Sequence, residues 1–354
     1  MKAEIAVMTA ENIDRDAIAR GGEILKKGGL VAFPTETVYG LGGNALDPKA
    51  SMKIYAAKGR PSDNPLIVHI ADIRDLDKIV TEIPEKARIL AEKYWPGPLT
   101  MILPKADIVP KETTGGLDSV AVRFPSDPIA QELILAAGGY VAAPSANTSG
   151  RPSPTTAGHV AEDLGEAIDM IIDGGQVNIG LESTIVDFTE EVPVVLRPGY
   201  ISLEMLRETL GDVRMDKGLI KPDSKVHPKA PGMKYRHYAP KADLAIVEGP
   251  DERVIAEIEK RALEAEKNGD TVGIIATDET KDRYSHGIIK SIGSREQEET
   301  IAHHLYEVLR DFDSCNVSAI YSEAFFTPKM GQAIMNRLLK AAGHKIINVE
   351  EETK

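Results

Sequence analysis

The feature that most constrains this chain is a short basic connector at residues 215–240, because it divides the sequence into two parts. The connector holds six basic and two acidic side chains together with four prolines. Residues 1–214 hold 21 basic and 31 acidic side chains, and residues 241–354 hold 15 and 22. Proline fixes φ and lacks a backbone donor, so the connector is expected to be an irregular linker. The sequence predicts a domain at 1–214, a linker at 215–240 and a smaller domain at 241–354.

Composition excludes several classes of protein. The net charge of −13 predicts no general attraction to nucleic acid or to anionic membranes. Cys315 is the single cysteine, which excludes an intramolecular disulfide and a cysteine-cluster metal site. The first residues have no apolar core of signal-peptide length, and the sequence has no stretch of about 20 apolar residues. We expect a soluble, cytoplasmic protein that makes no membrane contact.

Hydrophobic patterns alternate between helix and strand throughout the first part of the chain. The predicted helices lie at about 13–28, 48–57, 85–93, 128–137 and 156–164. The predicted strands lie at 30–33, 66–70, 99–103, 120–124, 140–143, 170–172, 183–187 and 192–196. Several of these strands follow one another without a long crossover, so we expect an α/β domain with a large mixed sheet.

The second part of the chain repeats a simpler pattern. Strands are predicted at 244–248, 272–276 and 317–321, and helices at 253–267, 298–310 and 331–342. Consecutive βα units of this kind build a parallel sheet with helices on both faces. The sequence therefore predicts a small, Rossmann-like α/β domain at the C-terminal end.

A dense set of polar side chains lies at 58–69, between a predicted helix and an apolar strand. Lys58 and Arg60 flank a glycine, so both cations can approach one ligand along an extended backbone. Polar loops that lead into strands of α/β proteins commonly hold anionic substrates. The alternative is a solvated surface loop with incidental charges, and these residues alone leave the choice open.

Hydroxyls and glycines follow the first predicted strand at 34–42. The spacing Gly40-x-Gly42-x-x-Ala45 partly fits a dinucleotide-binding fingerprint. We reject that interpretation because the helix begins only at Asp47-Pro48, whereas the fingerprint needs it to begin within the glycines. The segment is instead expected to present side-chain and backbone donors to a ligand.

Two further hydroxyl-rich segments follow predicted strands. Residues 143–153 offer four hydroxyls, an amide and an arginine with little bulk, which suits phosphate oxygens, although a plain turn has the same composition. Ser183, Thr184 and Arg197 add two hydroxyls and a cation. Arg123 ends an apolar strand, where burial requires an anionic partner, either a ligand or a structural salt bridge. Cations and hydroxyls without a serine triad or a nucleophilic cysteine are typical of transfer at a phosphoanhydride, with Mg²⁺ sharing the neutralisation of charge.

Five motifs together resemble one family. They are Pro34-Thr35-Glu36-Thr37-Val38-Tyr39-Gly40-Leu41, Lys58-Gly59-Arg60-Pro61, Ser145-Ala146-Asn147, Ser183-Thr184 and Leu196-Arg197-Pro198-Gly199. In this order they resemble the motifs of the YrdC/Sua-type threonylcarbamoyl-AMP synthases, and the linker with the C-terminal part resembles the two-domain form. The resemblance implies a twisted, open YrdC-like sheet with a concave cationic face.

The resemblance also implies an activity. Members of this family join L-threonine, bicarbonate or CO₂, and ATP, giving L-threonylcarbamoyladenylate and pyrophosphate in a nucleotidyl transfer. The expected cofactor is the Mg²⁺ that accompanies ATP. The product would pass to a downstream threonylcarbamoyl transferase complex that modifies adenosine in tRNA, so tRNA is an indirect partner.

The same resemblance implies two groups of site residues. Lys58 and Arg60 are the expected catalytic residues and also contact ATP. The other implied ATP contacts are Asn64, Ser119, Ser145, Asn147, Ser153, Arg197 and Tyr235, the last in a linker that closes over the site. The implied L-threonine contacts are Thr35, His69, Arg123, Ser183 and the backbone of Ala143. His69 is either a base for the threonine amine or a plain binding group, and no protein ligands to a metal are expected.

Two other classes of function remain as alternatives. The first is an RNA-binding module of the tRNA-modification machinery, against which the acidic balance of residues 1–214 argues. The second is a scaffold that has lost activity and docks a tRNA-modifying partner through its C-terminal domain. The presence of Lys58, Arg60, Ser145 and Asn147 argues against lost activity.

Overall fold

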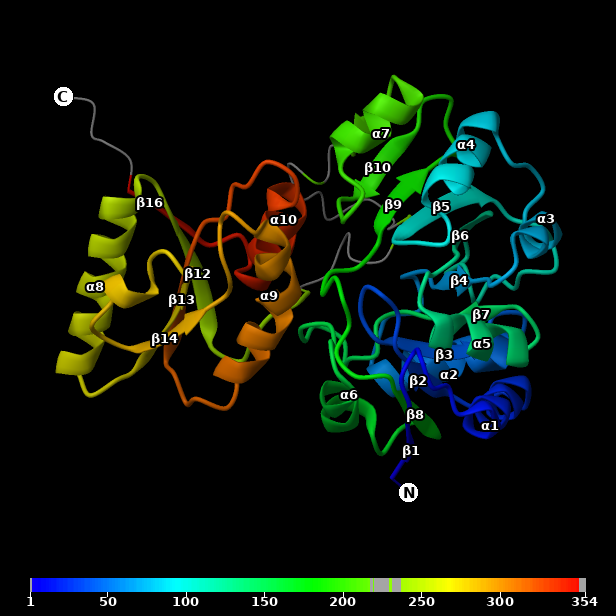
Figure 1. The fold of residues 1–354 in the computed structure, drawn as a ribbon, viewed down its shortest axis with the longest axis horizontal. Coiled ribbons are helices and arrows are strands. Elements are labelled where there is room, and N and C mark those ends of the chain that lie inside the picture. The colour runs from blue at the N-terminus through cyan, green and yellow to red at the C-terminus, as the bar shows by residue number, and fades with distance from the viewer. Residues whose placement is uncertain (1, 217–218, 220–228, 231–236, 350–354) are drawn as a thin grey trace. The chain divides into compact units, whose positions relative to one another are not determined.

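The computed structural model describes residues 2–216, 219, 229–230 and 237–349 (Figure 1). The chain forms two compact units, one of Met1–Ser149 with Ser153–Tyr235 and one of Gly150–Pro152 with Arg236–Lys354. Most of the predicted linker therefore lies outside the described residues. No helix in the described part of the chain has the length and apolar character needed to cross a bilayer.

The first unit is built on one large mixed sheet, as the sequence predicted. Among the described residues the sheet has eleven strands in the order β1-β8-β2-β3-β7-β4-β6-β5-β9-β10-β11. Strands β4 and β6 run parallel, whereas β5–β6 and β9–β10 are antiparallel pairs. The strands are β1 (Glu4–Val7), β2 (Val31–Phe33), β3 (Gly40–Asn44), β4 (Ile67–His69), β5 (Leu99–Pro104), β6 (Ser119–Arg123), β7 (Val141–Ala142), β8 (Met170–Asp173), β9 (Thr184–Asp187), β10 (Val194–Arg197) and β11 (Arg214–Met215).

Several helices of this unit begin at residues whose side chains cap them. Asp47 accepts a hydrogen bond from the backbone N–H of Lys49 at 2.9 Å, and Pro48 occupies the first turn. Asp127 and Thr156 cap later helices in the same way. The helices are α1 (Arg15–Lys26), α2 (Pro48–Lys58), α3 (Leu76–Ile79), α4 (Glu85–Tyr94), α5 (Pro128–Ala136), α6 (Ala157–Leu164) and α7 (Leu203–Leu210), with a 3-10 turn η1 (Ile73–Asp75) before α3.

The two faces of the large sheet are covered differently. One face packs along its length against α2, α4, α6 and α7, in a core that includes Val68, Val122 and Met101. The second core, beneath α1 and α5, takes its strand residues from β1, β8, β2 and β7. On that same side, the neighbouring strands β4, β6, β5, β9 and β10 carry a small separate cluster. It consists of Ile67, Ala121, Ile102, Ile185 and Leu196, with Ala230 packed against it. We call this side of β4, β6, β5, β9 and β10 the front face.

The second unit is the small parallel domain that the βα pattern predicted. Its described sheet has five parallel strands in the order β14-β13-β15-β12-β16. Helix α8 packs on one face through Val254 and Ile258. Helix α9 packs on the other face through Phe312. This ring lies so close to Gly273 of β13 that a Cβ there would be 2.6 Å from a ring carbon. The elements are β12 (Asp243–Glu248), α8 (Asp251–Lys267), β13 (Val272–Ala276), η3 (Lys281–Arg283), β14 (Ile288–Ser291), α9 (Glu298–Phe312), β15 (Ala319–Glu323), α10 (Gly331–Ala341) and β16 (Ile346–Asn348).

One segment expected as a loop is partly a strand. Residues 40–44 form β3, which pairs antiparallel with β2 and β7. Glycine is a poor strand former, but a Cβ at Gly42 would lie 2.9 Å from Val141 and 3.0 Å from Phe33, so only a bare backbone fits between these side chains. Helix α2 begins after β3 at Pro48, in agreement with the rejection of a dinucleotide fingerprint.

Candidate active site

A row of polar side chains crosses four neighbouring strands on the front face. His69 of β4 lies opposite Arg123 of β6, and Arg123 lies opposite Thr100 of β5. The hydroxyl of Thr100 is 2.7 Å from that of Ser183, just before β9. Side chains alternate along a strand, so these residues share the face of Ile67, Ala121, Ile102 and Ile185. We call His69, Arg123, Thr100 and Ser183 the strand row.

Arg197 extends the strand row at its β10 end. Its Nε donates to the backbone oxygen of Ser183 at 3.0 Å, and its Nη2 donates to the Ser183 hydroxyl at 3.1 Å. A register shift between Val195 and Arg197 turns the end of β10 at this point. The sequence assigned Ser183 to threonine and Arg197 to ATP, and the structure brings the two side chains into direct contact.

Arg123 is the buried cation of the strand row, with 4% of its surface exposed. Its Nη2 lies 2.8 Å from Oε1 of Glu36, so the structure contains the salt bridge that the sequence left open as one alternative. The Nε of Arg123 is buried and has no hydrogen-bond partner among the described residues. A buried donor without a partner costs free energy, which a carboxylate ligand would recover.

His69 is buried and neutral. Its Nδ1 lies 3.0 Å from the backbone oxygen of Ile67 and therefore carries the hydrogen. Burial first, and then the charge of Arg123, lower the pKa of His69 from 6.5 to about 3. A group with this pKa is a weak base at neutral pH, which favours a binding role for His69 over proton abstraction.

Thr35 and Ala143 lie near the β4 end of the strand row, because β7 is the neighbour of β4 in the sheet. The hydroxyl of Thr35 donates to the backbone oxygen of Val38 at 2.7 Å and lies 2.8 Å from that of Thr37, which holds a tight turn after β2. Ala143 follows β7, and its N–H donates to the oxygen of Ile67 at 2.9 Å. His69 pairs with Val141 of β7, so Ala143 lies two residues beyond the partner of His69.

A second group of polar residues gathers where α2 meets the loop after β7. Lys58, the last residue of α2, is 1% exposed. Its ammonium donates to the backbone oxygens of Ser145, at 2.5 Å, and of Asn147. The hydroxyl of Ser145 donates to Oδ1 of Asn147 at 2.5 Å. We call Lys58, Ser145 and Asn147 the loop cluster, and the structure brings these three predicted ATP contacts together.

Arg60, Asn64 and Ser119 lie at the other end of the strands from Arg123. The guanidinium of Arg60 donates to the backbone oxygens of Asn64 and Pro65, just before β4. Oδ1 of Asn64 is buried without a hydrogen-bond partner among the described residues. Ser119 begins β6, and a rise of about 3.3 Å per residue places it about 13 Å from Arg123.

Ser153 and Tyr235 are the two remaining predicted ATP contacts. The hydroxyl of Ser153 is buried and donates to a carboxylate oxygen of Glu182 at 2.5 Å. Tyr235 lies outside the described residues.

The turn after β2 connects the strand row with the loop cluster. The N–H of Leu41 donates to the oxygen of Pro144 at 2.8 Å, and that of Ala146 donates to the oxygen of Tyr39 at 2.8 Å. The N–H of Gly180 donates to the oxygen of Thr37 at 3.0 Å, which fixes the approach to Ser183. Segments from three parts of the sequence are therefore held in one hydrogen-bonded frame.

The sequence reasoning missed Glu36, Thr37, Thr100 and Glu182 as members of the site. Glu36 and Thr37 stood inside a quoted motif, and Thr100 was the one hydroxyl in the apolar run Leu99–Leu103. A lone polar residue on a buried strand needs a partner, and that signal was available. The partners themselves depend on long-range pairing that the sequence does not state.

Two titratable groups of the first unit, His69 and Asp127, make the free energy of unfolding depend on pH in opposite directions. The unfolded chain protonates His69 below a pKa of 6.5, whereas the folded chain does so only near 3. His69 therefore lowers the free energy of unfolding as the pH falls between these values. Asp127 acts in the opposite sense, because burial raises its pKa from 3.8 to about 6 and the folded chain then holds the extra proton.

His69→Gln should remove the first of these two contributions. The difference in free energy of unfolding between wild type and variant is expected to grow with pH, by up to about 1.4 kcal/mol per pH unit between about pH 4 and 6. Urea unfolding of both proteins at three pH values in this window measures that slope. A difference that stays constant across the window would contradict a depressed pKa for His69.

Together, the fold and the site define an α/β protein with an open mixed sheet that carries buried cations among hydroxyl-bearing side chains. Arg123 and Arg197 serve the strand row, and Lys58 and Arg60 serve the loop side. A small parallel domain follows on the same chain.

Comparison with known proteins identifies the family. The profile described as "Telomere recombination" matches residues 23–199, and the profile "Threonylcarbamoyl-AMP synthase, C-terminal domain" matches residues 201–343. The chain is 47% identical to the threonylcarbamoyl-AMP synthase of Pyrococcus abyssi over 345 residues, which are 98% of this chain and 99% of the relative. It is 50% identical to that of Bacillus subtilis over 331 residues, or 93% and 94% of the two chains.

A solved structure gives the same answer. The crystal structure of P. abyssi Sua5 complexed with L-threonine matches with a TM-score of 0.92 at 45% identity, covering 99% of this chain and 100% of that one. Escherichia coli YciO matches 56% of this chain with a TM-score of 0.51 at 27% identity. The chain belongs to the threonylcarbamoyl-AMP synthase family, as the five motifs indicated.

Proposed function

We propose that this chain is an L-threonylcarbamoyladenylate synthase that acts as a nucleotidyltransferase. It converts L-threonine, bicarbonate or CO₂, and ATP into L-threonylcarbamoyladenylate and pyrophosphate. The observation that carries the proposal is the pair of basic groups on one hydrogen-bonded frame, the strand row with Arg123 and the loop cluster with Lys58. The names of the relatives and the threonine complex of P. abyssi Sua5 support the choice of substrates.

The amino acid is assigned to the strand row. The buried guanidinium of Arg123 binds the carboxylate of L-threonine, and its unpartnered Nε is the donor available to that carboxylate. The hydroxyls of Thr35 and Ser183, together with the neutral His69, supply short-range polar contacts for the threonine side chain and amine.

The triphosphate is assigned to the loop side. Lys58 and Arg60 neutralise phosphate charge, while Ser145, Asn147 and Asn64 offer hydrogen bonds, with Ser119 and Arg197 at the borders. Glu36 and Glu182 are engaged by Arg123 and Ser153, so we assign Mg²⁺ to the ATP substrate, coordinated by phosphate oxygens.

The chemistry proceeds in two steps. The neutral threonine amine attacks the carbon of CO₂, and loss of an amine proton leaves an N-carboxylate. One oxygen of that carboxylate then attacks the α-phosphorus in line, the new P–O bond forms, and the α–β anhydride bond breaks to release pyrophosphate. Exclusion of water protects the carbamate.

The linker is the proposed lid. Lys229 lies 3.1 Å from Asp187 and 3.0 Å from Glu190, and Ala230 is fully buried on the front-face cluster. The chain is thus anchored on the front face just before 231–236, the segment that contains Tyr235. That segment lies outside the described residues, so its closure over the nucleotide stays a prediction from the sequence.

Cytoplasmic tRNA modification is the proposed setting. The adenylate is an activated acyl donor, so a downstream threonylcarbamoyl transferase complex would consume it and transfer the group to tRNA. Binding of tRNA by this chain itself is not needed for the reaction.

Pyrophosphate release from the purified chain tests the proposal. The expected result is ATP-to-pyrophosphate turnover that requires both L-threonine and bicarbonate, with a threonine-containing adenylate as the second product. Turnover that continues without threonine, or that gives phosphate in place of pyrophosphate, would contradict it. Omission of each substrate in turn serves as the control.

A further inference from the structure

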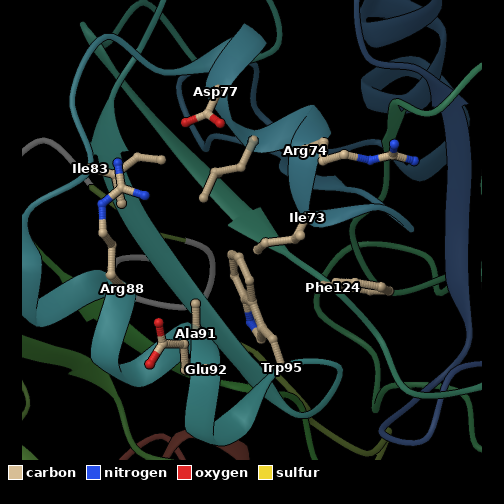
Figure 2. A pocket seen from close by; sticks show the side chains of 10 residues that line it. Ile73, Arg74, Asp77, Ile83, Arg88, Ala91, Glu92, Trp95 and Phe124 are labelled. Carbon is tan, nitrogen blue, oxygen red and sulfur yellow. The ribbon is translucent and has the colours of Figure 1, made fainter.

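A cavity of about 490 Å³ lies on the side of the first unit opposite the front face. Its walls come from η1, α3, α4 and the residues that follow α4 and β6 (Figure 2). Leu76, Ala91 and Trp95 of the lining also belong to the core cluster beneath α2, α4, α6 and α7. The cavity is therefore separated by the sheet from the strand row.

The interior of this cavity is apolar and aromatic. Ile73, Leu76, Ile83, Trp95 and Phe124 line it, and Trp95 is held in place by a hydrogen bond from its Nε1 to the oxygen of Leu99 at 2.7 Å. Ile73 is 47% exposed, a large fraction for an isoleucine beside a buried tryptophan. A volume of this size with an apolar lining and a few polar groups is typical of sites for small organic ligands.

Charged groups of both signs stand at the rim. Arg74 is already paired with Asp72, and Figure 2 shows its guanidinium pointing away from the cavity. Asp77 and Arg88 stand on the side opposite Phe124, and the side chain of neither makes a hydrogen bond or ion pair with another described residue (Figure 2). One cation, Arg88, and two carboxylates, Asp77 and Glu92, thus border the same aromatic chamber without a side-chain partner among the described residues.

We propose that this cavity binds an aromatic amino acid or a zwitterion of the same kind. The ring lies against Trp95 and Phe124, where stacked or edge-to-face contacts are favourable. The carboxylate pairs with Arg88 and the ammonium with Asp77, so Arg88 and Asp77 gain partners at once, and Glu92 adds a second negative charge near the ammonium. An aromatic anion or an aromatic amine satisfies only one of Arg88 and Asp77.

L-phenylalanine is the probe, and the emission of Trp95 is the readout. Trp95 is the single tryptophan of the chain, so its fluorescence reports on this cavity. A saturable change is expected when the full-length protein is titrated with L-phenylalanine. Phenylpropionate, which lacks the ammonium, and phenethylamine, which lacks the carboxylate, should each bind about fivefold more weakly, the size expected for one partly exposed ion pair.

Two substitutions at the exposed rim separate the roles of the charges. Arg88→Gln should weaken the binding of L-phenylalanine about fivefold and leave the affinity for phenethylamine unchanged. Asp77→Asn should likewise weaken the binding of L-phenylalanine about fivefold but leave the affinity for phenylpropionate unchanged. Lys86→Gln, two residues away on α4 and outside the lining, is the matched control and should leave all three affinities unchanged. Saturating L-threonine should not displace the probe, because the strand row lies across the sheet.

Calorimetric titration of the same four proteins guards against binding that does not alter the fluorescence. Absence of saturable binding of L-phenylalanine by both methods would overturn the proposal. So would equal affinity in the wild type, Arg88→Gln and Asp77→Asn proteins, or displacement by L-threonine. None of these measurements depends on catalysis, so they stand apart from the test of the proposed synthase activity.

Discussion

Replacement of Arg123 by glutamine is expected to raise the KM for L-threonine by about 100-fold, while the KM for ATP changes little. The physical reason is that the proposed contact of Arg123 with the threonine carboxylate is buried and charge-assisted, is worth about 3 kcal/mol, and is lost in the variant. Steady-state pyrophosphate release, with each substrate varied in turn, gives both constants. The expected pattern separates the amino-acid end of the site from the nucleotide end.

The Arg123 variant also leaves Glu36 without its cation, so stability must be controlled. Glu36 is 7% exposed, and a buried carboxylate without a partner destabilises the fold. The double variant Arg123→Gln with Glu36→Gln removes both charges and should recover stability but not the affinity for threonine. Arg60→Gln is the mirror experiment, with a raised KM for ATP and a nearly unchanged KM for threonine. Equal losses for both substrates in the Arg123 variant would contradict the assignment.

Replacement of Lys58 by methionine is expected to lower kcat by about 1000-fold. In the proposed site the ammonium neutralises charge on the triphosphate. A single positioned donor of this kind is worth about 10²–10³ in rate, and the lost order of the loop adds to the effect. The same change leaves the oxygens of Ser145 and Asn147 without their donor, which costs about 2–4 kcal/mol of stability. Single-turnover measurements on protein confirmed as folded by circular dichroism give the rate.

Lys49→Met is the matched control on the same helix. Lys49 is exposed near the start of α2, so its replacement should leave rate and stability near wild type. Ser145→Ala keeps the backbone oxygen that binds Lys58 and removes only the hydroxyl, so its effect should fall mainly on the KM for ATP. A Lys58→Met protein that folds and turns over at the wild-type rate would remove Lys58 from the chemistry.

Much of the fold could be predicted because its signals are local. The apolar runs at 66–70, 99–103 and 120–124 appear as β4, β5 and β6, and Asp47-Pro48 starts α2 as expected. The order of the strands could not be predicted in this way. Strands β4 and β6 are neighbours although β5 lies between them in sequence, and that pairing is set by long-range packing.

The sequence analysis missed several elements, among them the short or edge elements β1, α3, β11, β14 and β16. Two further misses, β3 and α7, have different physical reasons. Strand β3 is rich in glycine, and only its packing against Phe33 and Val141 makes it a strand. Helix α7 (Leu203–Leu210) carried visible signals, because Ser202 accepts from the N–H of Met205 and Leu206 faces the core. The first miss follows from tertiary override of propensity, whereas the second could have been avoided.

The candidate site was predictable as a set of residues but not as an arrangement. Lys58 and Ser145 were expected to serve one ligand, and the structure joins them through a backbone oxygen of the loop, a contact that no motif specifies. The sequence left two alternatives for the partner of Arg123, a ligand or a structural salt bridge, and the structure contains the salt bridge with Glu36. Register decides which polar side chains meet on the front face, and a sequence does not state register.

The most direct test of this account is a crystal structure of the chain with L-threonine and an ATP analogue that cannot be cleaved between the α- and β-phosphates. The account predicts the threonine carboxylate on Arg123 in the strand row, the triphosphate on Lys58 and Arg60, and the threonine amine directed toward the α-phosphorus. Threonine bound away from the strand row, or a triphosphate held on a different face of the sheet, would contradict it.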